Sequence, residues 1–323
     1  MLPLREIMAW RAHAAWRTDA QVEQDLLITR AMVAIFSDPF LSGQVAMRGG
    51  TILHKVHLAP AARYSEDIDL VAVGDRPAAH LRKALLRVLR PLLGEPPVNV
   101  VESVRLAVRN IARPSQIIRL GYEFRPTAPP PPAAKLKIEV NVTEREPVFD
   151  LVRIPYCPPL AECAAPVSLV SYDLDEMLGT KMRALLQREH GRDLFDLAHA
   201  WHHCAGSAPA SAEDAAANGV TRAVIDPSRV ARAFTEYMRR EGTIATCGGY
   251  SDDLARKLTL ARFRADLSDV LATDVAYDVD AAAAVLRDVF LPHLPGGALA
   301  GGALAGGAAP MVQAVVVGRA MSR

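Results

Sequence analysis

The sequence predicts an α+β protein, in which a half built on a mixed β-sheet flanked by helices precedes an α-helical half. Three observations predict this. Residues 135–142, KLKIEVNV, alternate strictly between apolar and polar side chains, as in a strand with one buried face. Apolar residues at three- and four-residue steps predict helices beside such strands. After about residue 165 the β signal fades and long helical patterns follow.

The length of 323 residues suits about two domains. We expect a first domain over residues 1–165, a helical domain over 166–294 and a tail over 295–323. The tail repeats the unit GGALA, and such low-complexity sequence is expected to be disordered.

The first half alternates between helical and strand patterns. Helices are expected at residues 20–37, from Thr51 onward and at 77–94, and strands at 67–73, 98–108, 116–124 and 135–142. Residues 126–132, PTAPPPP, cannot join a sheet ladder, because proline lacks the backbone N–H, so an exposed loop is expected there.

The second half is dominated by helical spacing. The stretch 173–203 predicts two helices joined at His190–Gly191, with Gly191 ending the first and Asp193 in the first turn of the second. Further helices are expected at 228–241, 251–271 and 279–291, and an Ala/Ser-rich loop at 206–219. Met177, Leu178, Met182 and Leu185 are expected to be buried.

Charge and cysteine usage place few limits on function. The net charge of +1 excludes neither nucleic acid nor small substrates. The four cysteines lack the spacing of a zinc site, and reduced thiols are expected. The N-terminus is interrupted by charges, unlike a signal peptide, and no apolar run approaches the length of a membrane span. We therefore expect a cytoplasmic protein without a membrane partner. The sequence does not indicate its oligomeric state.

Asp67 and Asp69 occupy alternate positions of an apolar strand. Their side chains share one face, about 7 Å apart at Cα. Two like charges there repel each other unless a cation binds between them, and oxygen ligands suit Mg²⁺ or Mn²⁺. Glu139, on the polar face of residues 135–142, offers a third carboxylate. We expect Asp67, Asp69 and Glu139 to bind metal and to be catalytic.

A glycine pair precedes the helix that opens at Thr51. Backbone N–H groups at a helix N-terminus favour an anion, and residues without Cβ allow a phosphate to approach. Arginines can neutralise phosphate and hydroxyl groups can donate to it. The expected nucleotide-binding residues of this segment are Arg48, Gly49, Gly50, Thr51, Arg63 and Ser65.

Together these motifs resemble a known family. G-G-T, a helix and then R-x-S-x-D-I-D-L, followed by KLKIEV and by KMRALLQREHGRDLFDL, resemble the AbiEii/AbiGii-type toxins, including mycobacterial ones, of the DNA polymerase β-like nucleotidyltransferase superfamily. The resemblance covers about residues 45–200. The gap from Gly50 to Asp67 is longer than in the general superfamily pattern, in keeping with the R-x-S insertion of this family.

The resemblance implies a nucleotidyltransferase-like fold and the transfer of a nucleotide from an NTP with release of pyrophosphate. By this resemblance Asp67 and Asp69 bind metal, Ser65 contacts the phosphates, and Lys181 and Asp196, with Asp193, complete the nucleotide site from the helical domain. It also implies a toxin with a cognate antitoxin, acting on RNA, with the tRNA 3′ end as the expected acceptor.

Several alternatives remain open at this stage. The acceptor can instead be a small molecule or a protein hydroxyl, or the chain can be a catalytically silent nucleotide-binding module. His199, His202, His203 and Cys204 form either a zinc site or an ordinary helix end. Residues 226–264 hold eight Arg/Lys against five Asp/Glu, which suits an RNA contact or a solvated face. A phosphate on Ser65 would repel substrate beside Asp67.

Overall fold

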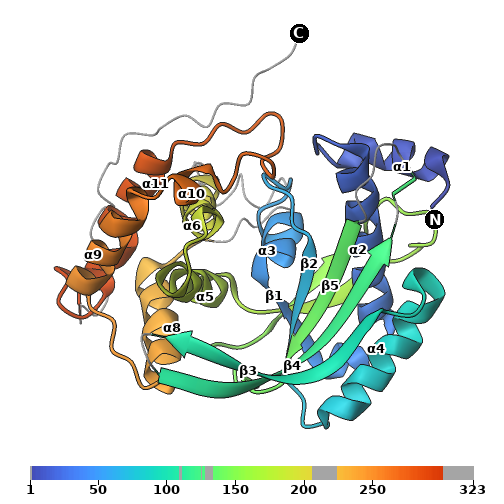
Figure 1. The fold of residues 1–323 in the computed structure, drawn as a ribbon, viewed down its shortest axis with the longest axis horizontal. Helices are drawn as coiled ribbons and strands as arrows, with labels where there is room; N and C mark the ends of the chain where they lie inside the picture. Colours follow the sequence, from blue (N-terminus) through green and yellow to red (C-terminus); the bar gives the residue numbers. More distant parts are fainter. Residues whose placement is uncertain (1, 109–110, 125, 128–133, 206–223, 301–323) are drawn as a thin grey trace, which may run out of the picture. The chain divides into compact units, whose positions relative to one another are not determined.

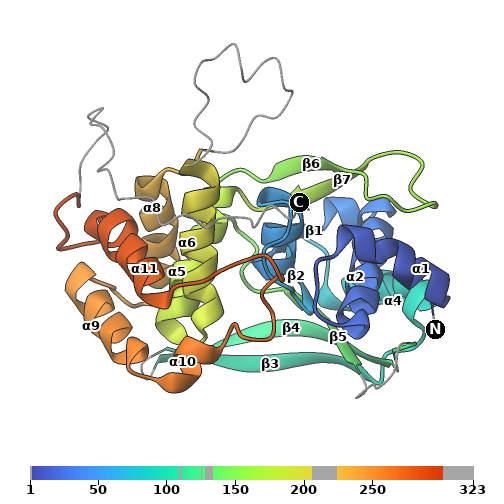
Figure 2. The ribbon, with the colours of Figure 1, turned by 90° about the horizontal axis from the view of Figure 1, so that it is seen from above.

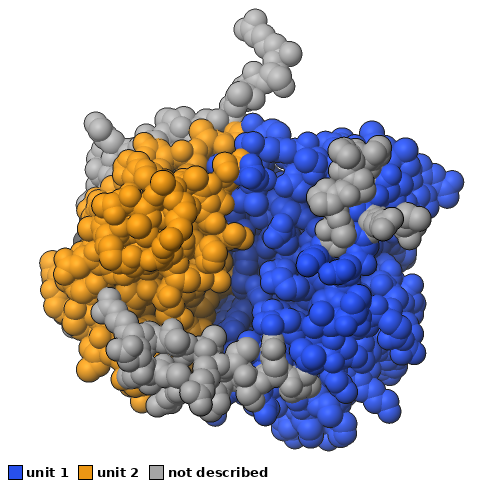
Figure 3. All heavy atoms as spheres, in the orientation of Figure 1, with its two compact units in different colours: residues 1–173, 269–273 blue, residues 174–268, 274–323 orange. Residues whose placement is uncertain are grey.

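The structure is a computed structural model that describes residues 2–108, 111–124, 126–127, 134–205 and 224–300. The chain divides into two compact units, coloured separately in Figure 3. Unit 1 holds Met1–Asp173 and Asp269–Thr273, and unit 2 holds Leu174–Ser268 and Asp274–Arg323. Each unit is described by itself.

Unit 1 is built on a seven-stranded mixed sheet in the order β3-β4-β5-β2-β1-β7-β6. The strands are β1 (Val45–Arg48), β2 (Asp67–Ala72), β3 (Val98–Val108), β4 (Ile111–Phe124), β5 (Ala134–Asn141), β6 (Val152–Tyr156) and β7 (Val167–Ser171). The central strand β2 pairs antiparallel with β1 and parallel with β5. This mixed sheet with flanking helices confirms the predicted α+β class.

The helices of unit 1 are α1 (Leu4–Trp10), α2 (Asp19–Ser37), α3 (Gly49–Ile52), which continues as a π-helical turn over Leu53–His57, and α4 (Ala78–Leu93). Figures 1 and 2 show α1, α2 and α4 together on one side of the sheet. A capping box starts α2, in which Thr18 accepts from the Gln21 amide and the Gln21 side chain accepts from the Thr18 amide.

Helix α2 carries buried polar side chains as well as an apolar core. Asp25, 2% exposed, accepts hydrogen bonds from the Trp10 indole and from Lys55, each at 2.8 Å. Because a buried carboxylate is costly without partners, this network fixes α1 and the end of the α3 segment against α2.

Four strands differ from the prediction. Strand β1, four residues long, lies where no strand is expected. So do β6 and β7, and β7 falls after residue 165. Both are only five residues long, and β6 is an edge strand, where Pro155 breaks the pattern without costing a ladder bond. Strand β4 begins at Ile111, before the expected start at 116. Its residues 111–115 pair with β3 and not with β5, so a proline at position 114 does not interrupt a ladder on the second side.

Unit 2 is helical within its described residues. Its helices are α5 (Leu174–Gln187), α6 (Gly191–Ala205), α8 (Pro227–Arg240), α9 (Cys247–Leu258), α10 (Ala261–Ala265) and α11 (Val279–Val285), the last continuing as a π-helical turn over Leu286–Phe290 and a 3₁₀ turn over Leu291–His293. The predicted apolar stripe of α5, including Met177 and Leu178, is fully buried. No described helix is long and apolar enough to cross a membrane.

Two helix boundaries were wrong in the prediction. Gly191 starts α6 rather than ending α5, and its bare Cα lies against the Phe263 backbone. The single helix expected at 251–271 is two helices, α9 and α10, separated by the extended residue Leu260. Helix α9 begins at Cys247, with Thr246 as its N-cap. This start was not predicted, because the first turn contains two glycines, which disfavour a helix. The loops expected at 128–132 and 206–219 and the tail from 301 lie outside the described residues.

Gly191→Ala is expected to destabilise the fold by about 2 kcal/mol, because a Cβ there would lie 2.2 Å from the Phe263 carbonyl oxygen and overpack the junction of α6 and α10. Gly248→Ala in α9 is the matched control, since a Cβ there meets nothing within 4 Å and alanine favours the helix. Chemical denaturation checks both variants. Equal midpoints would show that the close contact is not a constraint.

Candidate active site

The three predicted carboxylates lie side by side on strands β2 and β5. The parallel register pairs Asp67 with Lys137 and Asp69 with Glu139. Since residues in register on neighbouring strands share a face of the sheet, the three acids and Lys137 face the same way. Arg48 at the end of β1 is in register with Asp69 from the other side.

Asp67 is held by a lysine but keeps one free oxygen. Lys137 Nζ lies 2.9 Å from Asp67 Oδ2, whereas Oδ1 is shielded from solvent and has no hydrogen-bond partner within the described part of the chain. Burial raises the pKa of Asp67, and Glu139 adds to the rise, while Lys137 opposes it. Burial opposes the charge on Lys137, but the hydrogen bond to Asp67 outweighs it, so the pKa of Lys137 is raised.

Glu139 is paired with an arginine of the neighbouring strand. Arg119 on β4 is in register with Glu139, and its Nε donates to Glu139 Oε1 at 2.7 Å. This carboxylate is therefore engaged, as is Asp67 Oδ2. No group of three or more His, Cys, Asp or Glu side chains in the described ranges is arranged to hold a metal ion. The three-carboxylate metal set stays a prediction.

The two glycines give space to side chains of the site. Gly49 has φ +83°, and a Cβ there would lie 2.2 Å from Asp69 Oδ2. A Cβ at Gly50 would lie 2.5 Å from an Arg63 guanidinium nitrogen and 3.1 Å from the Ser65 hydroxyl. Only glycine combines this conformation with such a close approach. The segment Gly49–Gly50 thus brings Asp69, Arg63 and Ser65 together.

The other predicted nucleotide-binding residues of unit 1 have protein partners. Arg48 forms an ion pair with Glu144 at 2.7 Å. Thr51 is fully buried, and its hydroxyl donates to the Asp67 carbonyl, which ties α3 to the start of β2. Arg63 is 3% exposed, and its backbone forms a bridge with Leu271, so the segment 269–273 holds it. Their contact with a nucleotide stays a prediction.

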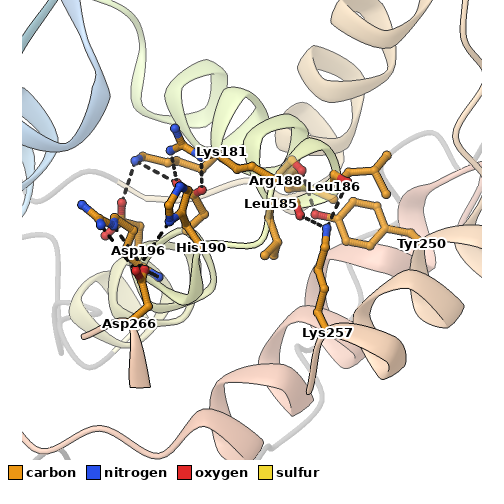
Figure 4. A network of polar contacts seen from close by, with 12 residues as sticks. Lys181, Leu185, Leu186, Arg188, His190, Asp196, Tyr250, Lys257 and Asp266 are labelled. Carbon is orange, nitrogen blue, oxygen red and sulfur yellow. Dashed lines mark hydrogen bonds and ion pairs between the residues drawn. The ribbon is translucent and has the colours of Figure 1, made fainter. Parts of the chain in front are cut away.

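A second cluster joins α5 and α6 in unit 2, as Figure 4 shows. Lys181 Nζ lies 2.7 Å from Asp196 and 3.3 Å from Asp193, and both aspartates are completely buried. Arg188 donates to both oxygens of Asp193, at 2.7 and 2.8 Å. Burial alone would raise the pKa of Asp193, but Lys181 and Arg188 outweigh it and the pKa is lowered.

The end of α5 is fixed by side chains from α9. Lys257, 1% exposed, donates to the carbonyls of Leu185 and Leu186, and the Tyr250 hydroxyl donates to the Met182 carbonyl at 2.7 Å (Figure 4). The Leu185 and Leu186 carbonyls belong to the last turn of α5, where carbonyls have no partner inside the helix. Burial lowers the pKa of Lys257, although Asp253 opposes the shift. The turn that carries Arg188 is thereby held at the side of Asp193.

Two histidines of α6 take part in aromatic packing, and His199 stacks on Phe195. The rings of Phe195 and His199 lie parallel with centroids 5.2 Å apart, and His203 lies 5.9 Å from His199. Burial lowers the pKa of His202. The described residues show no metal-binding group here, and the aromatic packing accounts for the spacing.

Sequence reasoning missed the counter-charges of the acids. Lys137 and Arg119 neutralise Asp67 and Glu139, Glu144 pairs with Arg48, and Arg188 pairs with Asp193. Lys137 lies two residues before Glu139 on an alternating strand, which places both on one face. Its pairing with Asp67 depends on which strands are neighbours, and the sequence carries no signal for that.

Comparison with known proteins identifies the family. A family model described as nucleotidyl transferase AbiEii toxin, type IV toxin–antitoxin system, matches residues 30–285. The chain is similar to MenT4, a nucleotidyltransferase toxin from Mycobacterium tuberculosis, at 17% identity and a TM-score of 0.49, over 90% of this chain and 89% of that one. It is also similar to an antigenic nucleotidyltransferase-like protein from Paracoccidioides brasiliensis, at 18% identity and a TM-score of 0.33, over 71% and 91%.

No curated protein matches the chain. The matched family model confirms the resemblance that the sequence motifs indicate and shows a nucleotidyltransferase. Because that model spans well over half of the 323 residues, the chain belongs to the AbiEii family of nucleotidyltransferase toxins.

Proposed function

We propose that this toxin moves a nucleoside monophosphate from an NTP onto RNA, at the 3′ end of tRNA, and so blocks translation. The observation that carries the proposal is the close packing of Asp69 against Gly49, two residues along β2 from the unpartnered oxygen of Asp67. A carboxylate pair with spare acceptor capacity beside a helix start is an arrangement suited to a cation and a triphosphate.

The residues fit the divalent cation that the family implies. Asp67 Oδ1 is a shielded acceptor without a partner, and carboxylate oxygens are the donors that Mg²⁺ prefers. Asp67 and Asp69 would hold the ion, with Glu139 as the proposed third ligand once Arg119 releases it. A cation bound there neutralises triphosphate and increases the electrophilicity of its α-phosphorus.

The chain's own residues then bind and orient the substrates. Arg63 and Ser65 lie beside Gly50, and in this proposal they contact phosphate oxygens. The acceptor hydroxyl attacks the α-phosphorus, the bond to the β-phosphate oxygen breaks, pyrophosphate leaves, and the hydroxyl proton passes to a carboxylate of the site. Positioning and charge stabilisation supply most of the rate in such transfers.

The roles of Lys181, Asp193 and Asp196 in nucleotide binding remain proposals. Their buried charge cluster has a structural role already, since it joins α5 to α6. An NTP-binding measurement on folded Lys181→Met protein distinguishes the two roles: a purely structural lysine leaves NTP affinity unchanged.

The toxin assignment implies a cognate antitoxin, and we propose that both act in the cytoplasm. The competing enzymatic hypothesis is transfer to a hydroxyl of a small molecule or a protein. The non-enzymatic hypothesis is a nucleotide-binding module without catalytic activity. Mass spectrometry of labelled products separates the acceptors.

Asp69→Asn is expected to lower nucleotide transfer by a hundredfold or more, on the order expected for loss of charge stabilisation. Labelled NTPs, each in turn, are incubated with total tRNA and Mg²⁺ or Mn²⁺. Asp150→Asn, an exposed acid-to-amide change in the same unit, serves as the control. Retained transfer or retained toxicity in the Asp69 variant would contradict the mechanism.

Mg²⁺ is expected to raise the thermal midpoint of the wild-type protein in the absence of NTP, because a ligand that binds only the folded state stabilises it. In Asp67→Asn and Asp69→Asn the rise disappears, whereas Asp150→Asn keeps it. An equal rise in all four proteins would mean that the ion binds elsewhere.

Asp193→Asn is expected to cost about 3 kcal/mol of unfolding free energy at neutral pH, because it removes the partner of Arg188 and one of the two partners of the buried Lys181. Since the pKa of Asp193 is lowered in the fold, its contribution is present above the ordinary aspartate pKa of about 3.9 and is lost as pH falls below that value. Denaturation between pH 8 and pH 3 tests this, with exposed Asp252→Asn as the control. A deficit that shrinks between pH 8 and pH 5 would contradict the assignment.

A further inference from the structure

Helix α4 lines a basic groove in unit 1 that has no role in the site described above. Its apolar side, with Leu81, Leu85 and Leu89, is buried. Along another side lies a cavity of about 900 Å³. We call this the α4 groove and define it by Arg76, Arg82, Lys83, Arg87, Arg90 and Phe40, all of which line it.

The positive charge of the α4 groove is only partly compensated. Arg87 pairs with Asp38 and Arg90 with Glu95, each at 2.5 Å, and both arginines are 64% exposed. The Arg90–Glu95 pair is exposed on both sides, and such pairs contribute little to stability, whereas Asp38 is largely buried. Arg82 and Lys83 form no ion pair with any described residue. The groove therefore has cations available for an anionic partner.

The basic helices of unit 2 contrast with α4. The basic residues of 226–264 that form ion pairs with acids of the same unit are Arg229, Arg239, Arg240, Arg256, Lys257, Arg262 and Arg264. Each of these cations has an acid of the same unit beside it, so this segment offers RNA less uncompensated positive charge than the α4 groove does. Of the two hypotheses for residues 226–264, a solvated face with internal ion pairs fits better than an RNA-binding surface.

An aromatic side chain lies among the cations of the groove. Phe40 lines the cavity and is half-buried. Its turn is fixed by Asp38, whose Oδ1 accepts from the Phe40 and Leu41 amides while its Oδ2 binds Arg87. Cations beside an aromatic ring are the elements by which proteins bind a single strand, with phosphates on the cations and a base on the ring.

The spacing of the cations fits an extended polyanion. Lys83, Arg87 and Arg90 follow one another at four- and three-residue steps, so they lie along one side of the helix. From position 80 to position 90 the helix rises about 15 Å, which spans several phosphates. An acidic peptide would satisfy the cations but offers no planar ring for Phe40, so charge and shape together favour nucleic acid.

We propose that the α4 groove binds a single-stranded RNA segment through its phosphates, with a base against Phe40. The claim that the acceptor RNA docks in this groove rests on the proposed function. The claim that the groove binds single-stranded RNA does not rest on it.

The test measures anisotropy of a fluorescein-labelled 12-nucleotide single-stranded RNA on the full chain without NTP. Arg82→Glu/Lys83→Glu is expected to weaken binding at least tenfold at 0.1 M salt, and to reduce the slope of log affinity against log salt by about 1.4, for two lost contacts at about 0.7 each. Arg5→Glu/Arg17→Glu changes the charge equally at exposed positions of the same unit and should bind within twofold of wild type.

A second pair of variants keeps the proposal falsifiable if the charge reversal unfolds α4. Arg82→Ala/Lys83→Ala retains good helix formers and should weaken binding several-fold. Phe40→Ala should weaken RNA binding while leaving inorganic polyphosphate binding unchanged. Equal binding by the groove and control variants overturns the proposal, as does competition by poly-glutamate as strong as that by unlabelled RNA.

Transfer assays separate this proposal from the proposed function. If RNA binds through the groove but no nucleotide is transferred, the proposed function fails and the groove stands. If transfer occurs and Arg82→Glu/Lys83→Glu leaves the KM for RNA unchanged, the groove proposal fails and the enzyme stands. A raised KM for RNA with unchanged kcat is the result expected when both hold.

Discussion

The approach of the Asp69 carboxylate to the bare backbone at Gly49 is the contact on which the site of unit 1 depends. It fixes the end of β1, the start of the α3 helix and the middle of β2 in one small volume. Arg63 and Ser65 fill the equivalent space at Gly50. The glycines therefore act by admitting the protein's own functional groups to the backbone, and any room for a phosphate is created by that arrangement.

Charge balance follows a different rule in each unit. In unit 1, Lys137 and Arg119 compensate the acids from neighbouring strands but leave one oxygen of Asp67 without a partner. In unit 2, the buried Lys181 and the half-exposed Arg188 are matched by the buried Asp193 and Asp196, beside a helix end that Lys257 and Tyr250 help to fix. The unpartnered oxygen of Asp67 is the feature on which the proposed metal binding rests, whereas the matched cluster joins α5 to α6, and the same side chain types serve both.

The sequence predicted the fold class and the face shared by Asp67 and Asp69, because strand alternation is a local property. It predicted α2, α4, α5 and α8 closely, because their apolar spacing is long and regular. Strands β1, β6 and β7 were not predicted, since four or five residues carry little periodicity and β6 also contains a proline. The ion-pair partners of the site carboxylates were not predicted for another reason. Arg119 and Lys137 meet Glu139 and Asp67 only through the strand order, which arises from long-range packing that no single segment encodes.

The segment Asp269–Thr273 belongs to unit 1 although the chain on either side of it belongs to unit 2. It bonds to Gln21, Ala62 and Tyr64 and forms the bridge to Arg63. The toxin is thus not a tandem of separable halves. A gene fragment that ends near residue 173 lacks this support for Arg63 and therefore cannot encode an intact unit 1.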